Sequence, residues 1–412
     1  MKSLFQENIP RKSSIKIFYL NYLQLLQSLF FFTIASFSIQ TCMGATTNER
    51  FKQNIIDICL GNITAPPGVT WNATALGNMC AVTGNGSGGG VAISANLGNS
   101  DTSNVSISPA NKKVHKCFDD LKQDASNNDC PNGGWGLLFA TQFGRSSRPE
   151  TELENGFQSD LKGILVGIDY RFSDSFILGS AVGATQDEAV FSNSAGSLKT
   201  RNNTISLYTT WLPSSKFSID GYVGYGAANY NSKRLIIYGT SFTGTTFGNT
   251  SSKQTLAGLS AAFLGKFRDT NISPFINIDY LNTDTKGFNE TGSTSLELRY
   301  RDRTSQSNTA SLGIKLSQIY TFKWGKLTPN LNWSGVHEFQ SNSTKINNEL
   351  VITPGAGILV ATDEPDRDYF LSGFGVVATL NGGMLLFMNY ERRSGDNLLD
   401  SWVTSLGLIK EF

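Results

Sequence analysis

The chain has 412 residues, a formal net charge of +1, 16% charged and 39% hydrophobic residues, 41 glycines and 27 phenylalanines. This balance excludes a protein that binds nucleic acid through a basic surface, since no excess of positive charge is available for phosphates. It also excludes a multi-helix membrane protein, since only one apolar stretch approaches a spanning length, whereas the glycines and aromatic residues indicate strands and turns.

The start of the chain has the pattern of a secretory signal. Four basic residues precede the apolar stretch Leu23–Ile39, and the small residues Gly44 and Ala45 follow it. A basic region, an apolar region and a small-residue exit, in this order, are typical of exported proteins. We predict a signal peptide over residues 1–45, and an uncleaved membrane anchor is the alternative.

Beyond this signal, cysteines occur only before residue 131, at Cys59, Cys80, Cys117 and Cys130. An even number of cysteines in an exported segment favours disulfides, and the absence of a CxxC pair argues against a metal site. Three connectivities are open. The simplest of them pairs Cys59 with Cys80 and Cys117 with Cys130.

Residues 46–132 read as a short, cysteine-containing N-terminal segment. Arg50–Leu60 and Asn111–Ser126 have helical patterns, and between them lies a Gly/Ser-rich stretch that includes Gly84–Gly90. Gly/Ser tracts behave as flexible linkers. The segment has too little apolar content for a sizeable core, so we expect disulfides to hold it together.

The rest of the chain alternates apolar and polar residues with the period of a β-strand. In one such stretch Ile164, Val166 and Ile168 fall on one face, whereas Asp169 and Arg171 fall on the other. The second face is polar and rich in glycine along most of these stretches. This is expected for a water-filled lumen rather than for a packed core.

Twelve strands are predicted in this way. Their ranges are Trp135–Phe143, Asp160–Phe172, Ser175–Glu188, Lys199–Leu212, Lys216–Tyr230, Ser251–Arg268, Ile272–Thr283, Ser305–Thr321, Trp324–Gln340, Asp368–Leu380, Gly382–Arg393 and Ser401–Phe412. Connections after even-numbered strands are tight. Connections after odd-numbered strands are long, for instance Asn231–Thr250, Asp284–Thr304 and Ser341–Arg367. The first two are rich in Thr, Gly, Ser and Asn, as flexible surface loops are.

Short turns on one side and long loops on the other are required of an even-stranded outer-membrane barrel. The predicted fold class is therefore all-β: a closed 12-stranded antiparallel transmembrane β-barrel over residues 133–412, with a small N-terminal helical or irregular segment. Aromatic residues near strand ends, such as Trp135, Trp211, Trp324 and Trp402, fit interfacial girdles. We predict the outer membrane of a Gram-negative bacterium as its location and outer-membrane lipid as its surroundings.

The C-terminal residues add a resemblance to a known family. Gly373–Leu380 reads GFGVVATL, a Gly-Gly turn at Gly382 follows, Phe387–Glu391 reads FMNYE, and the last strand ends on Phe412. These features resemble the autotransporter (type V secretion) β-domain family over about residues 133–412. Lys410 departs from the family pattern, in which an apolar residue is usual two positions before the end.

The resemblance implies that the final strand, ending on Phe412, is read by the outer-membrane barrel insertion machinery. It also implies a helix that threads the pore and leads to an exported passenger. Asn111–Ser126 lies where that helix would be, and a short periplasmic helix is an equal alternative. Only the 46–132 segment is available here as a passenger. Since a disulfide-closed loop is wider than one extended strand, part of this segment is hypothesised to fold in the periplasm.

No catalytic chemistry is predicted. There is no GxSxG motif, the only histidines are His115 and His337, and the carboxylates of Asp363, Glu364 and Asp366 read as a solvated acidic loop. We therefore expect no enzyme, no catalytic, cofactor-binding or metal site, no cofactor, no nucleic-acid partner and a monomer. The leading hypothesis is an autotransporter-type barrel that anchors or translocates a very short N-terminal passenger and displays its loops. The alternative is a porin-like or structural barrel, or an adhesin that acts through its extracellular loops.

Overall fold

The computed structural model describes residues 54–55, 57–59, 62–83, 134–151, 153–173, 175–238, 242–340, 346–360, 362–364, 366–381 and 383–412. The predicted signal peptide, the helix predicted over Asn111–Ser126, and Cys117 and Cys130 lie outside these described residues. Among the residues that are described, no helix is long and apolar enough to span a membrane.

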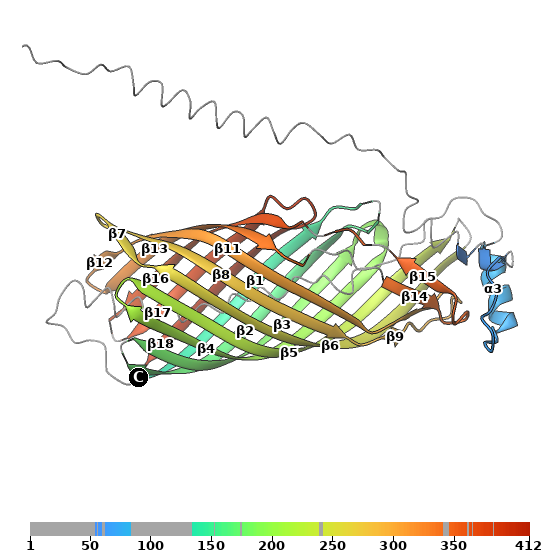
Figure 1. Ribbon diagram of the computed structural model, residues 1–412, viewed down its shortest axis with the longest axis horizontal. Coiled ribbons are helices and arrows are strands. Elements are labelled where there is room, and N and C mark those ends of the chain that lie inside the picture. The colour runs from blue at the N-terminus through green and yellow to red at the C-terminus, as the bar shows by residue number, and fades with distance from the viewer. Residues whose placement is uncertain are drawn as a thin grey trace, which may run out of the picture. The chain divides into compact units, whose positions relative to one another are not determined.

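Twelve long antiparallel strands form one closed barrel (Figure 1). They are β1 (Gly134–Arg148), β2 (Phe157–Ser173), β3 (Phe176–Phe191), β4 (Gly196–Ser214), β5 (Phe217–Tyr238), β6 (Phe242–Phe263), β8 (Thr270–Thr285), β11 (Arg303–Gln318), β13 (Gly325–Glu338), β16 (Asp368–Leu380), β17 (Met384–Ser394) and β18 (Asp400–Glu411). Each strand pairs with its neighbours in chain order, and the seam between β18 and β1 places Leu408 opposite Phe139. Closure leaves no unpaired sheet edge in the hydrocarbon, so the predicted barrel is confirmed.

The remaining elements lie at the two ends of the barrel. β7 (Gly265–Phe267) and β12 (Tyr320–Phe322) extend hairpins at the end with the short turns. At the other end β9 (Phe288–Asn289), β10 (Leu298–Tyr300), β14 (Ile346–Leu350) and β15 (Gly357–Val360) form a separate four-stranded sheet. The described part of the chain contains the helix α3 (Ala73–Thr83), a 3₁₀ turn, η1 (Ser192–Ser194), and helical residues at 54–55 and 57–59.

The predicted strands agree with the structure best where the alternation is strict. Asp368–Leu380, for example, is β16 with the same two ends. The largest difference is at Asn231–Thr250, most of which belongs to β5 and β6, each 22 residues long. The prediction of flexible surface loops is wrong here and in Asp284–Thr304, which contains β9 and β10, and the predicted connection Ser341–Arg367 contains β14 and β15. The apolar run Leu235–Ile237 supplies the reason, because such residues gain from pairing and burial even within a polar stretch.

The outward face of the barrel is apolar, as the alternation predicts. Ile164 and Ile168 are 53% and 48% exposed, whereas Asp169 on the opposite face is 4% exposed. Aromatic side chains gather near both ends of this face. Trp135 and Tyr170 are in ring contact near the short turns, at 5.1 Å between centroids. Toward the other end the contacts include Trp333 with Phe370 and Phe374 with Tyr390. These two belts confirm the predicted girdles.

The inward face packs aromatic rings over glycines of neighbouring strands. A Cβ on Gly258 would overlap the ring of Tyr222, and a Cβ on Gly179 would overlap Tyr208. The Tyr222 hydroxyl donates a hydrogen bond of 2.7 Å to Asp279. Glycine is required at such positions because only a bare backbone lets a large ring lie flat against the wall.

Near the short turns the inward face departs from the predicted polar lumen. A buried cluster there contains Leu138, Leu165, Leu385, Phe387 and Ile409. These residues come from β1, β2, β17 and β18, so the apolar layer lies on the inner side of the seam. The prediction of a polar, water-filled lumen is therefore wrong at this level. Other inward positions carry polar residues, such as Asp169, which accepts from the Tyr208 hydroxyl at 2.9 Å.

Candidate functional site: the extracellular cap

The end of the barrel that carries the long connections is the extracellular end, since outer-membrane barrels keep their short turns in the periplasm. At this end we define the cap as residues 232–238, 242–248, 286–302 and 346–360 together with the described residues of 54–83. The extended hairpin of β5 and β6 forms one wall of the cap, with Phe242 paired to Tyr238 at its tip. The inward-facing residues of this hairpin meet the segment that contains β9 and β10.

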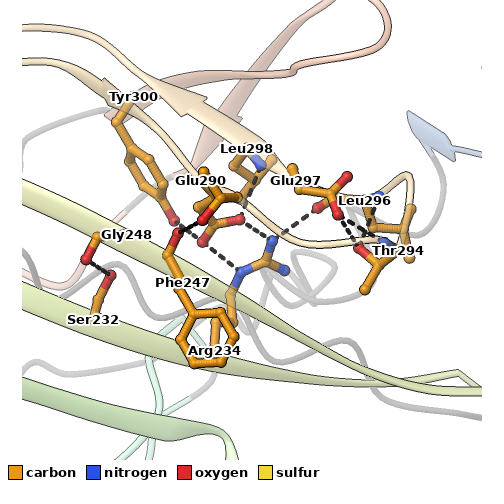
Figure 2. Close-up of polar contacts among 11 residues, drawn as sticks. Ser232, Arg234, Phe247, Gly248, Glu290, Thr294, Leu296, Glu297, Leu298 and Tyr300 are labelled. Carbon is orange, nitrogen blue, oxygen red and sulfur yellow. Dashed lines mark hydrogen bonds and ion pairs between the residues drawn. The ribbon is translucent and has the colours of Figure 1, made fainter.

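Arg234 is the centre of the polar contacts in the cap (Figure 2). Its guanidinium Nε donates to Glu290 Oε1 at 2.9 Å, and Nη2 donates both to Glu290 Oε2 and, at 2.8 Å, to the carbonyl of Leu296. The two side chains are only 1% and 3% exposed. A two-pronged, buried ion pair of this kind has a fixed geometry, so it holds the 286–302 segment against β5 in one position.

Glu290 accepts hydrogen bonds from two further donors of the cap. The backbone N–H of Leu298 donates to Glu290 Oε2 at 2.9 Å, and the Tyr300 hydroxyl donates to Oε1 at 3.5 Å. Burial, together with the negative charge of Glu290, raises the pKa of Tyr300 above its usual value, so the phenol stays protonated. The ring of Tyr300 stacks on Phe288, with 4.6 Å between centroids. The carboxylate thus ties β9 and β10 to one another.

The turn that leads into β10 is held by its own side chains. Glu297 Oε1 accepts from the backbone N–H and the hydroxyl of Thr294 at 2.7 and 3.0 Å, as Figure 2 shows. The Thr294 hydroxyl in turn accepts from the N–H of Leu296 at 3.1 Å. Ser295 takes the left-handed conformation, with φ of 58°. The turn therefore presents Leu296 inward while the backbone N–H groups of Thr294 and Leu296 and the carbonyl of Leu296 all have partners.

An apolar core lies under the polar contacts and joins the cap to the N-terminal segment. Ile55, Ile58 and Met79 of that segment are 0–3% exposed. They pack in one cluster with side chains of the hairpin and of the small sheet: Ile236, Leu296, Leu298, Tyr300, Leu350, Ala356 and Ile358. Burying side chains of this size from both partners stabilises their association by roughly 1.5–3 kcal/mol each.

The N-terminal part of the cap is closed by a disulfide and by two further contacts. Cys59 and Cys80 are bonded, with 5.4 Å between their Cα atoms, which confirms this half of the predicted pairing. The indole N–H of Trp71 donates to the carbonyl of Pro354 at 3.2 Å. Gly355, with φ of +89°, lies against Pro66. The helix predicted over Arg50–Leu60 is helical at the described residues 54–55 and 57–59.

Loss of the disulfide is expected to loosen the N-terminal part of the cap and to leave the barrel intact. In a Cys59→Ser/Cys80→Ser variant we expect this unit to lose about 2–3 kcal/mol of stability, because the unfolded segment gains loop entropy. Hydrogen exchange of the full chain checks this. The α3 amides should exchange faster, the amides of β1 to β4 should be unchanged, and equal α3 exchange in both proteins would contradict the prediction.

A second polar cluster lies at the extracellular end, between the β1–β2 connection and the predicted acidic loop. Arg148 contacts Glu154 and lies 2.5 Å from Asp363, which also accepts from the Thr151 hydroxyl at 2.6 Å. Burial raises the pKa of Glu154, and the charge of Arg148 opposes this effect. Glu364 is exposed, as expected of a solvated loop, but Asp363 is held in a structural contact.

Sequence reasoning did not identify the cap. Arg234, Glu290 and Glu297 lie in segments predicted to be flexible loops. The available signal was the alternation of Leu296, Leu298 and Tyr300 within a loop, which is the pattern of a short half-buried strand. His337, the one histidine among the described residues, is exposed and lies 2.7 Å from Asp368.

Comparisons with known proteins show which family has this architecture. The family model described as the autotransporter β-domain matches residues 138–391, from β1 to β17. This chain belongs to the autotransporter β-domain family. The match includes the hairpin and the small sheet of the cap, and it confirms the resemblance found in the C-terminal residues.

Two solved autotransporter β-domains share the fold. The translocator domain of the autotransporter NalP from Neisseria meningitidis has a TM-score of 0.55 at 13% identity, over 74% of this chain and 98% of that one. The β-domain of the Bordetella autotransporter BrkA has a TM-score of 0.50 at 15% identity, over 68% of this chain and 100% of that one. At these identities the likeness concerns the barrel fold alone.

One curated protein shares part of the autotransporter β-domain sequence. Outer membrane protein A of Rickettsia rickettsii is 22% identical over 259 residues, which are 60% of this chain. The chain spans 12% of the length of that relative. Together with the barrel, these matches assign the autotransporter β-domain described here to the outer membrane of a Gram-negative bacterium.

Proposed function

We propose that this autotransporter β-domain displays residues 54–83 at the cell surface, as a disulfide-closed unit seated on the cap. The observation that carries the proposal is the shared apolar core, in which Ile55, Ile58 and Met79 are buried among residues of the extracellular hairpin and sheet. Periplasmic residence of this unit would leave both halves of that core exposed to water. The proposal therefore differs from the hypothesis that the disulfide keeps this segment in the periplasm.

The positions of the chain on either side of the 84–133 segment support the same function. Met79 lies in the cap, whereas Gly134 begins β1 at the opposite end, beside the last residue, Phe412. The 50 residues 84–133 must link the two ends. In a bilayer the barrel interior is the route on which a polar chain avoids lipid. We propose that the chain crosses there, in keeping with the role of the family.

An epitope tag tests the proposal. Inserted between Pro67 and Gly68, which are both exposed, the tag is expected to bind antibody on intact cells. The same tag between Ser214 and Ser215, in a short turn, should become accessible only after the outer membrane is permeabilised. A 67/68 tag that is also hidden until permeabilisation would refute surface display.

Three further parts of the proposal concern the insertion of the barrel, its oligomeric state and its lack of enzymatic activity. The final strand, β18, pairs fully with β1 up to Glu411, so a signal ending on Phe412 would lie at the seam. We propose that insertion machinery reads it there. We also propose a monomeric, non-enzymatic anchor, because the apolar core and the Arg234–Glu290 ion pair of the cap hold the loops and the N-terminal unit together.

A further inference from the structure

The outward face carries basic residues just beyond the apolar belt, toward the extracellular end. On β2, Lys162 is the next outward-facing residue beyond Ile164 toward the extracellular end. On β4, Arg201 lies beyond Ile205 toward the extracellular end, with one outward position between them. On β6, Lys253 stands two outward positions beyond Ala257, and all three cations are exposed. We call Lys162, Arg201 and Lys253 the basic row.

The register of the sheet brings the basic row together. Lys162 is opposite Gln186 on β3, and Gln186 is opposite Arg201 on β4, so the first two cations lie on one line across the strands. Adjacent strands are about 4.8 Å apart, which places their Cα atoms roughly 10 Å from each other. Two strands further on, this line meets β6 at Ser251, through Asn229 on β5, and Lys253 stands one outward position away from it, toward the short turns.

Two other cations of the outward face have carboxylate partners. Arg145 on β1 lies 2.8 Å from Asp160, and Arg392 on β17 lies 3.0 Å from Asp400. The members of the basic row make no ion pair with any residue of the described part of the chain. Their positive charge is therefore available to a partner outside the barrel.

The carboxylates near the row are engaged by other residues. Asp160, whose charge also acts on Lys162, lies 2.8 Å from Arg145. Glu188 lies 3.5 Å from Lys199. Asp284 stands opposite Lys253 in the register, but its oxygens accept from Asn282 at 3.0 Å and from Thr304 at 2.7 Å. These contacts reduce the competition that either carboxylate offers to an added anion.

We propose that the basic row binds the phosphate groups of a phosphorylated glycolipid of the outer leaflet, with lipid A as the test compound. The position decides the occupant: the row begins where the apolar belt ends, and lipid headgroups lie at that level. Guanidinium and ammonium groups pair strongly with phosphate in this poorly hydrated layer. The acyl chains would lie along the outward Ile164, Val182 and Ile205, below the row.

Binding of labelled lipid A to the purified full chain in detergent tests this proposal. A triple variant, Lys162→Gln/Arg201→Gln/Lys253→Gln, is expected to bind about 100-fold more weakly, since each cation near a lipid surface contributes roughly fivefold in affinity. The matched control, Lys216→Gln/Lys266→Gln/Lys323→Gln, removes three exposed lysines at the periplasmic end and should bind like the unaltered protein.

Three competitors identify the ligand. Unlabelled lipid A should displace the label, whereas dephosphorylated lipid A, phosphatidylglycerol and inorganic phosphate at equal concentration should not. Equal binding by the triple variant and the unaltered chain would overturn the proposal, as would displacement by any of the other three compounds. If the triple variant fails to fold, the single Arg201→Gln variant replaces it, with an expected loss of about fivefold.

Discussion

Replacing Arg234 by methionine is expected to destabilise the cap by about 3–5 kcal/mol, the cost of leaving a buried charge without its partner. Glu290, 3% exposed, would remain among apolar side chains, and the carbonyl of Leu296 would lose a donor. Hydrogen exchange of the full chain measures the effect. The amides of β9 and β10 should lose most of their protection, while those of β1 to β4 keep theirs.

Two control variants separate the lost ion pair from a general loss of charge. In Arg234→Met/Glu290→Gln the uncompensated charge is gone and the amide oxygen still accepts from Leu298, so much of the protection should return. Arg145→Met breaks an exposed pair with Asp160, which solvent screens, and should leave the protection of β9 and β10 unchanged. Equal protection in Arg234→Met and the unaltered chain would show that the pair does not hold the cap.

The second large effect is expected inside the barrel, from Gly258→Ala. The added methyl group would overlap the Tyr222 ring, which must then leave its place and its hydrogen bond to Asp279. Overpacking and the loss of a buried hydrogen bond together cost about 3–5 kcal/mol. Urea unfolding of the barrel in lipid vesicles, followed by tryptophan fluorescence, should show a correspondingly lower midpoint.

Gly221→Ala is the matched control for this substitution. Gly221 pairs with Leu259, beside Gly258, but faces outward, and the nearest atom to an added Cβ is Thr209 Cγ2 at 3.6 Å. We expect a change below about 1 kcal/mol there. A midpoint in Gly258→Ala as high as in Gly221→Ala would show that Tyr222 can move without cost.

The barrel could be predicted from the sequence because a strand between lipid and lumen repeats every two residues. That period is local, so Ile164, Val166 and Ile168 reveal both the strand and its outward face. Turn lengths then gave the strand count and the direction of insertion. The disulfide of Cys59 with Cys80 was also accessible, as the simplest pairing of neighbouring cysteines.

The cap could not be predicted in the same way because its stability depends on contacts between segments that are distant in the chain. Arg234 and Glu290 are 56 residues apart, and each stands in a stretch whose composition is that of a loop. The 54–83 unit lies farther still from Leu296 and Leu350, with which it shares a core. The sequence reveals whether a residue is buried only where apolar and polar residues alternate regularly.

The seam between β1 and β18 also constrains the kinetics of folding. Its paired residues, such as Phe139 and Leu408, are about 270 positions apart in the chain. Synthesis proceeds from the N-terminus, so β1 emerges long before its second partner and must wait with one edge unpaired. Contacts of such high sequence separation form slowly because the loop-closure entropy is lost before they stabilise the chain. Ring closure is therefore expected to be the last step of assembly, and a holding factor in the periplasm would protect β1 from aggregation until then.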